Sequence, residues 1–371
     1  MIKKSKIMAF SDHHHEVVKN HSKKEMIADL LKRLEAGLVP DEEMRNLFRF
    51  ELERRLQWGY KSIHQEQLSQ LLKLAHSTKE MTIVAEMDAL NSSMYELPIS
   101  FLQIQLGSNL KQSSLYFKDE LTTVDEAEVA IMDLYLERAQ IEDGQSILDL
   151  GCGLGAFSFH VARKYTNCNI TAVTNSLTQK EFIEKKSKIL NIQNVKVIFA
   201  DVTTVEMETT FDRVFAIGLI EHMQNYELFL KKLSKWMKQD GLLFIEHFCH
   251  KTLAYHYKPI DEDDWFTNLL YPNGTVISSS LLLYFQDDVS VVDHWSLSGK
   301  HFSRASEESL KRMDAKMDEM KEIFESITDS KEEAMKLINQ WRIFCISCAE
   351  MFGYNNGEEW MTSHFLFKKK L

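Results

Sequence analysis

Proline and glycine are scarce in this chain of 371 residues, which holds 4 prolines and 13 glycines. That scarcity excludes a collagen-like, linker-rich or disordered chain, because such chains need many of both residues. Cysteine is scarce too, and its 5 copies form no secreted disulfide framework. No apolar run approaches the length of a membrane span, and the N-terminus has no signal-peptide core. We therefore expect a cytoplasmic globular protein.

Basic residues are outnumbered, with 44 Lys and Arg against 55 Asp and Glu and a net charge of −11. This balance disfavours a nucleic-acid groove or an anionic membrane surface, because both need a broad basic field. It suits a cationic substrate as a long-range bias. We expect a small-molecule substrate, no nucleic-acid or membrane partner, and either a monomer or a homodimer.

Two stretches have residue types that bind metals. Cys345 and Cys348 form a C-x-x-C pair, but zinc would need two further ligands at motif spacing. The tract His13–His15 lies in a polar terminal segment, where solvated tails are common. We expect two thiols on adjacent turns of a helix, and no metal site.

The pattern of apolar residues divides the chain into a polar tail (1–22), an N-terminal helical lid (23–121), a core (122–248) and a substrate cap with C-terminal helices and closing strands (249–371). Strand and helix patterns alternate five times in the core. This alternation predicts an α/β fold with a Rossmann-like, doubly wound parallel sheet. The cap is inserted after the fifth strand. The expected strands are residues 146–150, 169–174, 195–199, 211–217 and 241–245.

A glycine-dense turn follows the first expected strand, with glycine at 151, 153 and 155 after Asp149. Such a turn lets backbone N–H groups approach a polar ligand without obstruction by Cβ atoms. Gly151-x-Gly153-x-x-Ala156 satisfies the dinucleotide fingerprint. With Asp149 and Gly155 included, the turn resembles the first motif of S-adenosylmethionine-dependent methyltransferases. A tight turn without any ligand is the third alternative.

The ends of the second and third strands favour S-adenosylmethionine. A nicotinamide enzyme would carry Asp or Glu after its second strand, where this chain has Thr174-Asn175. Most methyltransferases also have an acid there, but one branch uses Thr-x-Ser-x-x-Gln, which fits Thr174 and Gln179. Asp201 after the third strand suits the adenine amino group. We expect the irregular stretch 77–121 to descend over this cofactor pocket.

Longer sequence motifs indicate the protein family more specifically than these strand ends do. They resemble the coclaurine N-methyltransferase family of plant alkaloid enzymes, which is itself similar to bacterial cyclopropane-fatty-acid synthases. The resemblance extends from about residue 30 to the end, and it implies an S-adenosylmethionine-dependent amine N-methyltransferase. The words include Tyr116-Phe-Lys-Asp119, Asp149-Leu-Gly-Cys-Gly-Leu-Gly155, Ala172-Val-Thr-Asn-Ser176, Glu221-His-Met223, Glu246-His247 and Ser298-Gly-Lys-His-Phe302.

Glu221 and His222 follow the fourth strand, and the resemblance gives them a catalytic role. Histidine has the unperturbed pKa of a general base, and the carboxylate could polarise the imidazole or attract a cationic amine. Alternatively, the pair caps the next helix. The resemblance also implies contacts to the cofactor by Ser113, Gly151, Gly153, Asn175, Gln179, Asp201, Val202 and Ile217, and to the substrate by Gly218, His247, Tyr284, Phe285 and Trp341.

The chain departs from the family pattern at two places. Gly218 stands where the family has Glu, and Gln112-Ser113 stands where a Tyr-Ser pair is expected. Losing a carboxylate and a ring from one pocket should change which amine fits. We expect a substrate range shifted toward smaller phenylalkylamines or other isoquinolines.

The expected cap is rich in aromatic and His residues between positions 250 and 302. Aromatic faces attract cations, so this lining suits an aromatic amine, although packing over the sheet would use the same residues. The acidic run 261–264 is expected to be a solvated loop. Two functional alternatives stay open: methylene transfer to a lipid double bond, as in cyclopropane synthases, and S-adenosylmethionine binding without catalysis.

Overall fold

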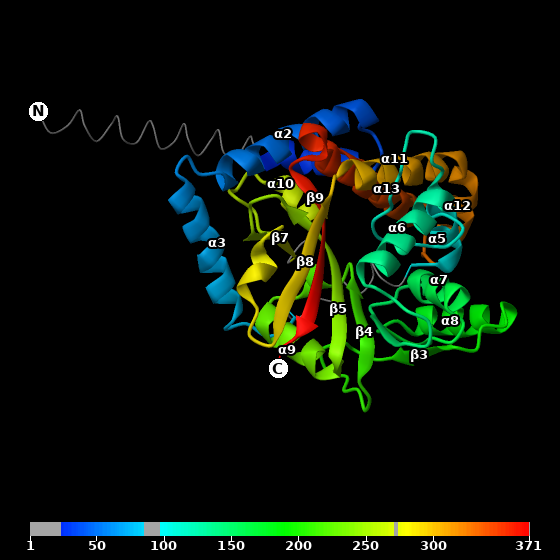
Figure 1. Ribbon diagram of the computed structural model, residues 1–371. Coiled ribbons are helices and arrows are strands. Elements are labelled where there is room, and N and C mark those ends of the chain that lie inside the picture. Colours follow the sequence, from blue (N-terminus) through cyan, green and yellow to red (C-terminus); the bar gives the residue numbers. More distant parts are fainter. Residues whose placement is uncertain (1–23, 85–96, 271–273, 371) are drawn as a thin grey trace, which may run out of the picture.

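Residues 24–84, 97–270 and 274–370 are described in the structure, which is a computed structural model (Figure 1). The expected polar tail lies outside these residues. Within them a nine-stranded sheet has the central order β3-β2-β1-β4-β5, with all neighbours parallel. This confirms the doubly wound parallel sheet. The five strands are β1 (Ser146–Leu150), β2 (Asn169–Thr174), β3 (Val195–Phe199), β4 (Phe211–Ile217) and β5 (Met237–His250).

The sheet continues beyond β5 with the closing strands expected near the C-terminus. In Figure 1 the last two long strands run beside β5, and β9 pairs antiparallel with both β5 and β8. On the other side of β5, beyond the end of β4, a short parallel strand pairs with Cys249 and His250. The additional strands are β6 (Tyr255–His256), β7 (Thr275–Ser278), β8 (Val289–Leu297) and β9 (Trp360–Lys369).

The fifth strand is longer than the expected segment 241–245. The expected strand ended at Ile245, where the apolar run stops before Glu246 and His247. In the structure β5 continues to His250, since β9 pairs with it over Leu242–His250 and His364 of β9 hydrogen-bonds to Glu246. Glu246 still lies level with the end of β4, opposite Ile217.

Helices cover both faces of the sheet. Side chains of β1 alternate between two clusters: Ile147 packs with α6 and α7, and Leu148 packs with α9. Polar side chains cap α6, α8 and α9, with a capping box of Thr123 and Glu126 before α6. The helices of the core are α6 (Val124–Arg138), α7 (Ala156–Lys164), α8 (Leu177–Ile189) and α9 (Tyr226–Trp236), with the 3₁₀ turn η1 (Ile220–His222) before α9.

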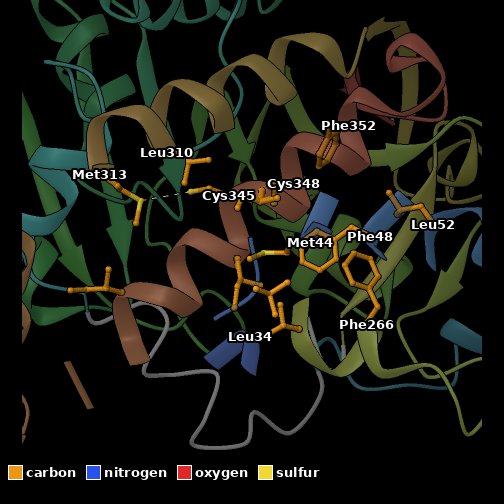
Figure 2. Close-up of a cluster of buried hydrophobic side chains, with 14 of the residues drawn as sticks. Leu34, Met44, Phe48, Leu52, Phe266, Leu310, Met313, Cys345, Cys348 and Phe352 are labelled. Carbon is orange, nitrogen blue, oxygen red and sulfur yellow. Dashed lines mark hydrogen bonds between the residues drawn. The ribbon is translucent and has the colours of Figure 1, made fainter. Parts of the chain in front are cut away.

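A separate helical layer lies over one end of the sheet (Figure 1). Helices from the N-terminal and C-terminal parts of the chain share one apolar core there, in which Met44 and Phe48 meet Phe266, Cys348 and Phe352 (Figure 2). Two further elements, α3 (His64–Thr78) and η2 (Leu281–Tyr284), pack together beside the sheet. The helical layer consists of α2 (Asp41–Gly59), α5 (Ile99–Gln105), α10 (Trp265–Leu270), α11 (Lys300–Ala315), α12 (Met317–Glu325), α13 (Lys331–Gly353) and η3 (Tyr354–Gly357).

The acidic run 261–264 is not a solvated loop throughout. Asp264 is buried and forms an ion pair with Arg55 at 2.6 Å, so it joins α10 to α2. The two thiols of Cys345 and Cys348 are buried on α13, as expected. Among the described residues, no group of His, Cys, Asp and Glu could hold a metal ion, and no helix is long and apolar enough to cross a membrane.

Candidate active site

The turn between β1 and α7 is held open by three glycines in the left-handed region. Gly151, Gly153 and Gly155 have φ values of +68°, +54° and +76°, which residues with a side chain rarely adopt. A Cβ atom on Gly153 would lie 2.7 Å from Oε1 of Gln112. Helix α7 starts directly after the turn, at Ala156. The turn is therefore a cradle of bare backbone at the N-terminus of a helix, which suits a polar ligand.

Asp149 lies beneath this cradle at the end of β1. Its side chain is 2% exposed and accepts a hydrogen bond of 2.6 Å from the hydroxyl of Ser158. Burial raises its pKa to about 6. The carboxylate thus ties the strand to the first turn of α7 and fixes the path of the glycine turn.

Replacing Gly153 with alanine tests the cradle. We expect Gly153→Ala to lower the free energy of unfolding by about 1–2 kcal/mol, from the left-handed φ, and to weaken binding of S-adenosylhomocysteine about tenfold, a typical effect of about 1.4 kcal/mol. Gly144→Ala is the matched control, since Gly144 has a φ of +88° with nothing within 4 Å of its Cβ position. Denaturant unfolding and titration calorimetry measure both effects; equal ligand affinity in the two variants would contradict a cradle.

The ends of β2 and β3 present ordered polar side chains. The Thr174 hydroxyl donates to Oε1 of Gln179 at 2.6 Å, which fixes the orientation of that amide. The Ser176 hydroxyl accepts a hydrogen bond from the backbone N–H of Gln179 and so caps α8, and Asn175 before it is exposed. Asp201 accepts hydrogen bonds of 2.7 Å from the backbone and hydroxyl of Thr203, with Val202 half-buried between them.

A segment from Lys111 to Ser114 crosses the carboxyl ends of the strands. Gln112 meets Gly153, the Cβ atom of Ser113 lies 3.5 Å from the Cβ position of Gly218, and Ser114 hydrogen-bonds to Thr362 of β9 at 3.1 Å. The segment therefore spans β1, β4 and β9 and brings Ser113 beside the end of β4. This part of the stretch 77–121 lies where the sequence predicted; residues 85–96 are outside the described part.

Glu221 and His222 form the turn η1 after β4. The backbone N–H of Phe248 donates to Oε1 of Glu221 at 2.7 Å, whereas Oε2 is buried with no hydrogen-bond partner among the described residues. Burial, helped by the negative charge of Glu246, raises the pKa of Glu221 to about 7. Burial lowers the pKa of His222 to about 4.

The alternative that this pair caps the following helix is wrong. Helix α9 is capped by Asn225, whose side chain accepts a hydrogen bond of 2.9 Å from the backbone N–H of Leu228. The free energy of burying Glu221 is thus not offset by a capping role. A buried acid with an unused oxygen is typical of a functional site.

Glu246 and His247 point to opposite faces of β5. Glu246 accepts hydrogen bonds from Tyr135 and His364; burial opposes its ionisation, but His364, the charge of Lys111 and Tyr135 together lower its pKa to about 2. His247 is fully buried, its Nδ1 lies 3.1 Å from the carbonyl of Phe248, and burial lowers its pKa to about 4. The sequence did not reveal the Tyr135–Glu246–His364 network, because its members come from three distant elements.

The other residues predicted to contact substrate lie in different packing clusters. Phe285 is buried, with its ring centroid 5.6 Å from that of Tyr226, and Tyr284 beside it is 40% exposed. Trp341 lies on α13 in the helical layer, 5.6 Å from Phe101. The structure thus brings together Ser113, Gly218 and the glycine cradle, but it shows no contact of Tyr284, Phe285 or Trp341 with that group.

Residues 85–360 match the family described as mycolic acid cyclopropane synthetase. The (S)-coclaurine N-methyltransferase of Papaver somniferum is 61% identical over 344 residues, which cover 92% of this chain and 98% of that protein. The pavine N-methyltransferase of Thalictrum flavum subsp. glaucum is 57% identical over 351 residues, or 94% and 99% of the two chains. The chain belongs to the coclaurine N-methyltransferase family.

This membership agrees with the fold. A crystal structure of coclaurine N-methyltransferase bound to N-methylheliamine and S-adenosylhomocysteine has a TM-score of 0.91 and 60% identity, covering 93% of this chain and 100% of that one. The protein is an S-adenosylmethionine-dependent N-methyltransferase, as the sequence predicted. The lipid alternative is less well supported, because the Escherichia coli cyclopropane-fatty-acyl-phospholipid synthase shares 23% identity over 54% of this chain and 50% of its own. The alternative of S-adenosylmethionine binding without catalysis is not supported by these relatives, which are enzymes.

Proposed function

We propose that this N-methyltransferase acts on the nitrogen of an isoquinoline or phenylalkylamine alkaloid, at the edge of the sheet between the glycine cradle and η1. The observation that carries the proposal is Glu221, a buried carboxyl group after β4 with one oxygen that has no hydrogen-bond partner among the described residues. A protonated amine is a ligand that satisfies both the charge and the hydrogen-bonding capacity of that oxygen.

The residues at the strand ends fit S-adenosylmethionine. The cradle has backbone where a Cβ atom would obstruct a ligand, and Asn175, Gln179 and Asp201 supply amide and carboxylate groups for ribose and adenine. When bound, the cofactor supplies a methyl group on a sulfonium. We assign its contacts to Ser113, Gly151, Gly153, Asn175, Gln179, Asp201, Val202 and Ile217.

Glu221 and His222 divide the handling of the amine between them. Alkylamines are mostly protonated near neutral pH, but only the free base has the lone pair needed to attack a methyl group. A pKa of about 7 matches Glu221 to accept a proton near neutrality, while His222, with a pKa of about 4, stays neutral and accepts a hydrogen bond. We therefore assign Glu221 as the stronger base and His222 as the group that orients the amine.

Gly218 adjusts which amine fits. It lies beside Ser113 and has a φ of +60°, and the carboxylate expected there in the family is absent from this chain. We propose that the pocket prefers amines with fewer polar substituents near the nitrogen. We also propose substrate contacts by His247 of β5, Tyr284 of η2, Phe285 directly after it and Trp341 of α13, although the last three do not contact Ser113, Gly218 or the glycine cradle in this structure.

A labelled methyl donor tests the class of acceptor. We expect label from S-adenosylmethionine to enter isoquinolines and phenylalkylamines, and not the acyl chains of anionic phospholipid vesicles. The same enzyme preparation serves both assays, and boiled enzyme is the control. Label in the lipid with none in any amine would contradict the proposal.

The compartment and assembly state follow from composition. All five cysteines are free thiols, which suits a reducing compartment, so we propose that the protein is cytoplasmic. The net charge of −11 argues against a nucleic-acid partner. We propose a monomer or homodimer, which light scattering of the purified chain distinguishes.

A further inference from the structure

Lys111 is a buried cation in the segment that crosses the strand ends. The residue is 6% exposed, although it lies in an irregular connection between α5 and α6. Its backbone N–H donates to Oε1 of Glu128 at 3.1 Å, and Glu128 also accepts from the backbone of Asn109 at 2.8 Å. These bonds fix the position from which the side chain enters the site.

The ammonium group has few partners for its charge. It hydrogen-bonds to the hydroxyl of Ser113 and lies 5.3 Å from the centroid of the Tyr135 ring. It makes no ion pair with any carboxylate of the described residues, and burial lowers its pKa. An ammonium has three donors, so two remain for a ligand. A buried charge without a directly bonded counter-ion is costly, which indicates that an anion completes the site.

No neighbouring carboxylate of the described residues forms an ion pair with the ammonium. Oε2 of Glu246 accepts hydrogen bonds from Tyr135 and His364 while its Oε1 has no hydrogen-bond partner among those residues, Asp149 accepts from Ser158, and Glu128 accepts from two backbone N–H groups. Their charges act on Lys111 from a distance and oppose the lowering of its pKa by burial. None of them takes the place of a directly bonded anion.

We propose that Lys111 binds the α-carboxylate of the methionyl part of S-adenosylmethionine, and that the Ser113 hydroxyl orients the ammonium. This proposal rests on the cofactor of the proposed function. The carboxylate is the only anionic group of that cofactor, whose sulfonium and ammonium are both positive. Lys111 belongs to the same short segment as Gln112, which meets the glycine cradle at Gly153.

Two ligands that differ only in the carboxylate test the assignment. Titration calorimetry compares S-adenosylhomocysteine with its decarboxylated analogue. Removing a charged hydrogen-bond partner typically weakens binding about 10- to 100-fold. We therefore expect Lys111→Met to weaken the binding of S-adenosylhomocysteine by about that factor. The binding of the decarboxylated analogue should weaken by less than about threefold. Lys111→Arg should restore much of the discrimination between the two ligands. Lys118→Met, at an exposed position of the same connection between α5 and α6, should behave like the wild type.

Equal weakening of both ligands by Lys111→Met, or no weakening of either, would overturn the proposal. If that variant fails to fold, the wild type still provides a test, since the preference for S-adenosylhomocysteine over the analogue should fall as alkaline pH neutralises Lys111. A preference that is constant up to alkaline pH would also overturn it. No amine acceptor is present in these titrations, so they do not depend on the proposed amine substrate.

Discussion

Glu221→Gln is expected to lower the rate of amine methylation by about 10²- to 10⁴-fold, the usual range for removing a general base. The amide keeps the shape of the side chain and can still accept the hydrogen bond that Phe248 donates at 2.7 Å. It has neither the negative charge that holds a cationic amine nor the capacity to take its proton. Rates measured with saturating amine separate the loss of proton transfer from weaker amine binding.

The same variant is expected to be more stable than the wild type. Burial raises the pKa of Glu221 to about 7, above the value of about 4.3 in an unfolded chain. Folding therefore takes up a proton between these values, and stability falls as the pH rises from about 4.3 to 7, by an amount on the order of 3 kcal/mol. Glutamine does not ionise, so the variant avoids this loss above neutral pH.

Denaturant unfolding at pH 5 and pH 8 checks the sign. The stability difference between Glu221→Gln and the wild type should grow from pH 5 to pH 8. Glu208→Gln, at an exposed position after β3, is the matched control and should show no such growth. A stability difference that does not change with pH would show that Glu221 is not a buried acid with a raised pKa. Wild-type activity of the variant would show that Glu221 is not a base in the reaction.

Gly218→Glu is expected to change the order of preferred amines. The Cβ position of Gly218 lies 3.5 Å from the Cβ atom of Ser113, an ordinary contact, so a side chain can enter the site. A new carboxylate there should favour amines with hydroxyl groups near the nitrogen. We expect the ratio of kcat/KM for a hydroxylated benzylisoquinoline to that for a simple phenylalkylamine to rise about tenfold, equivalent to about 1.4 kcal/mol.

Gly218→Ala separates the carboxylate from the backbone. Both variants place a side chain at a φ of +60° and should lose about 1–2 kcal/mol of stability from that conformation. Only the glutamate variant should alter the preference. Turnover across one amine panel by the three proteins gives the answer, and the same order of amines in all three would remove Gly218 from the account of specificity.

Local patterns were sufficient to predict most of the core. Strands β1 to β4 have the expected bounds, because short apolar runs are local signals. The expected end of β5 was wrong, because Glu246 is hydrogen-bonded to His364, which is more than a hundred residues away in the sequence.

The site could be predicted where residue type alone carries the chemistry. The glycine turn, the polar strand ends and the Glu221–His222 pair all follow recognisable runs. The proposed role of Lys111 could not be predicted, because a single lysine in an irregular segment gives no pattern and its burial depends on Tyr135 and on the fold around it. Its neighbours Gln112 and Ser113 were predicted to belong to the site only through the family resemblance.

One measurement tests the central claim that this protein methylates an amine nitrogen. Purified enzyme with labelled S-adenosylmethionine is incubated with phenylalkylamines, benzylisoquinolines and protoberberines, and the products are separated by liquid chromatography. We predict label on the nitrogen of at least one phenylalkylamine or isoquinoline, with loss of that product in Glu221→Gln. Binding of S-adenosylhomocysteine with no labelled amine from any of the three classes would contradict the claim.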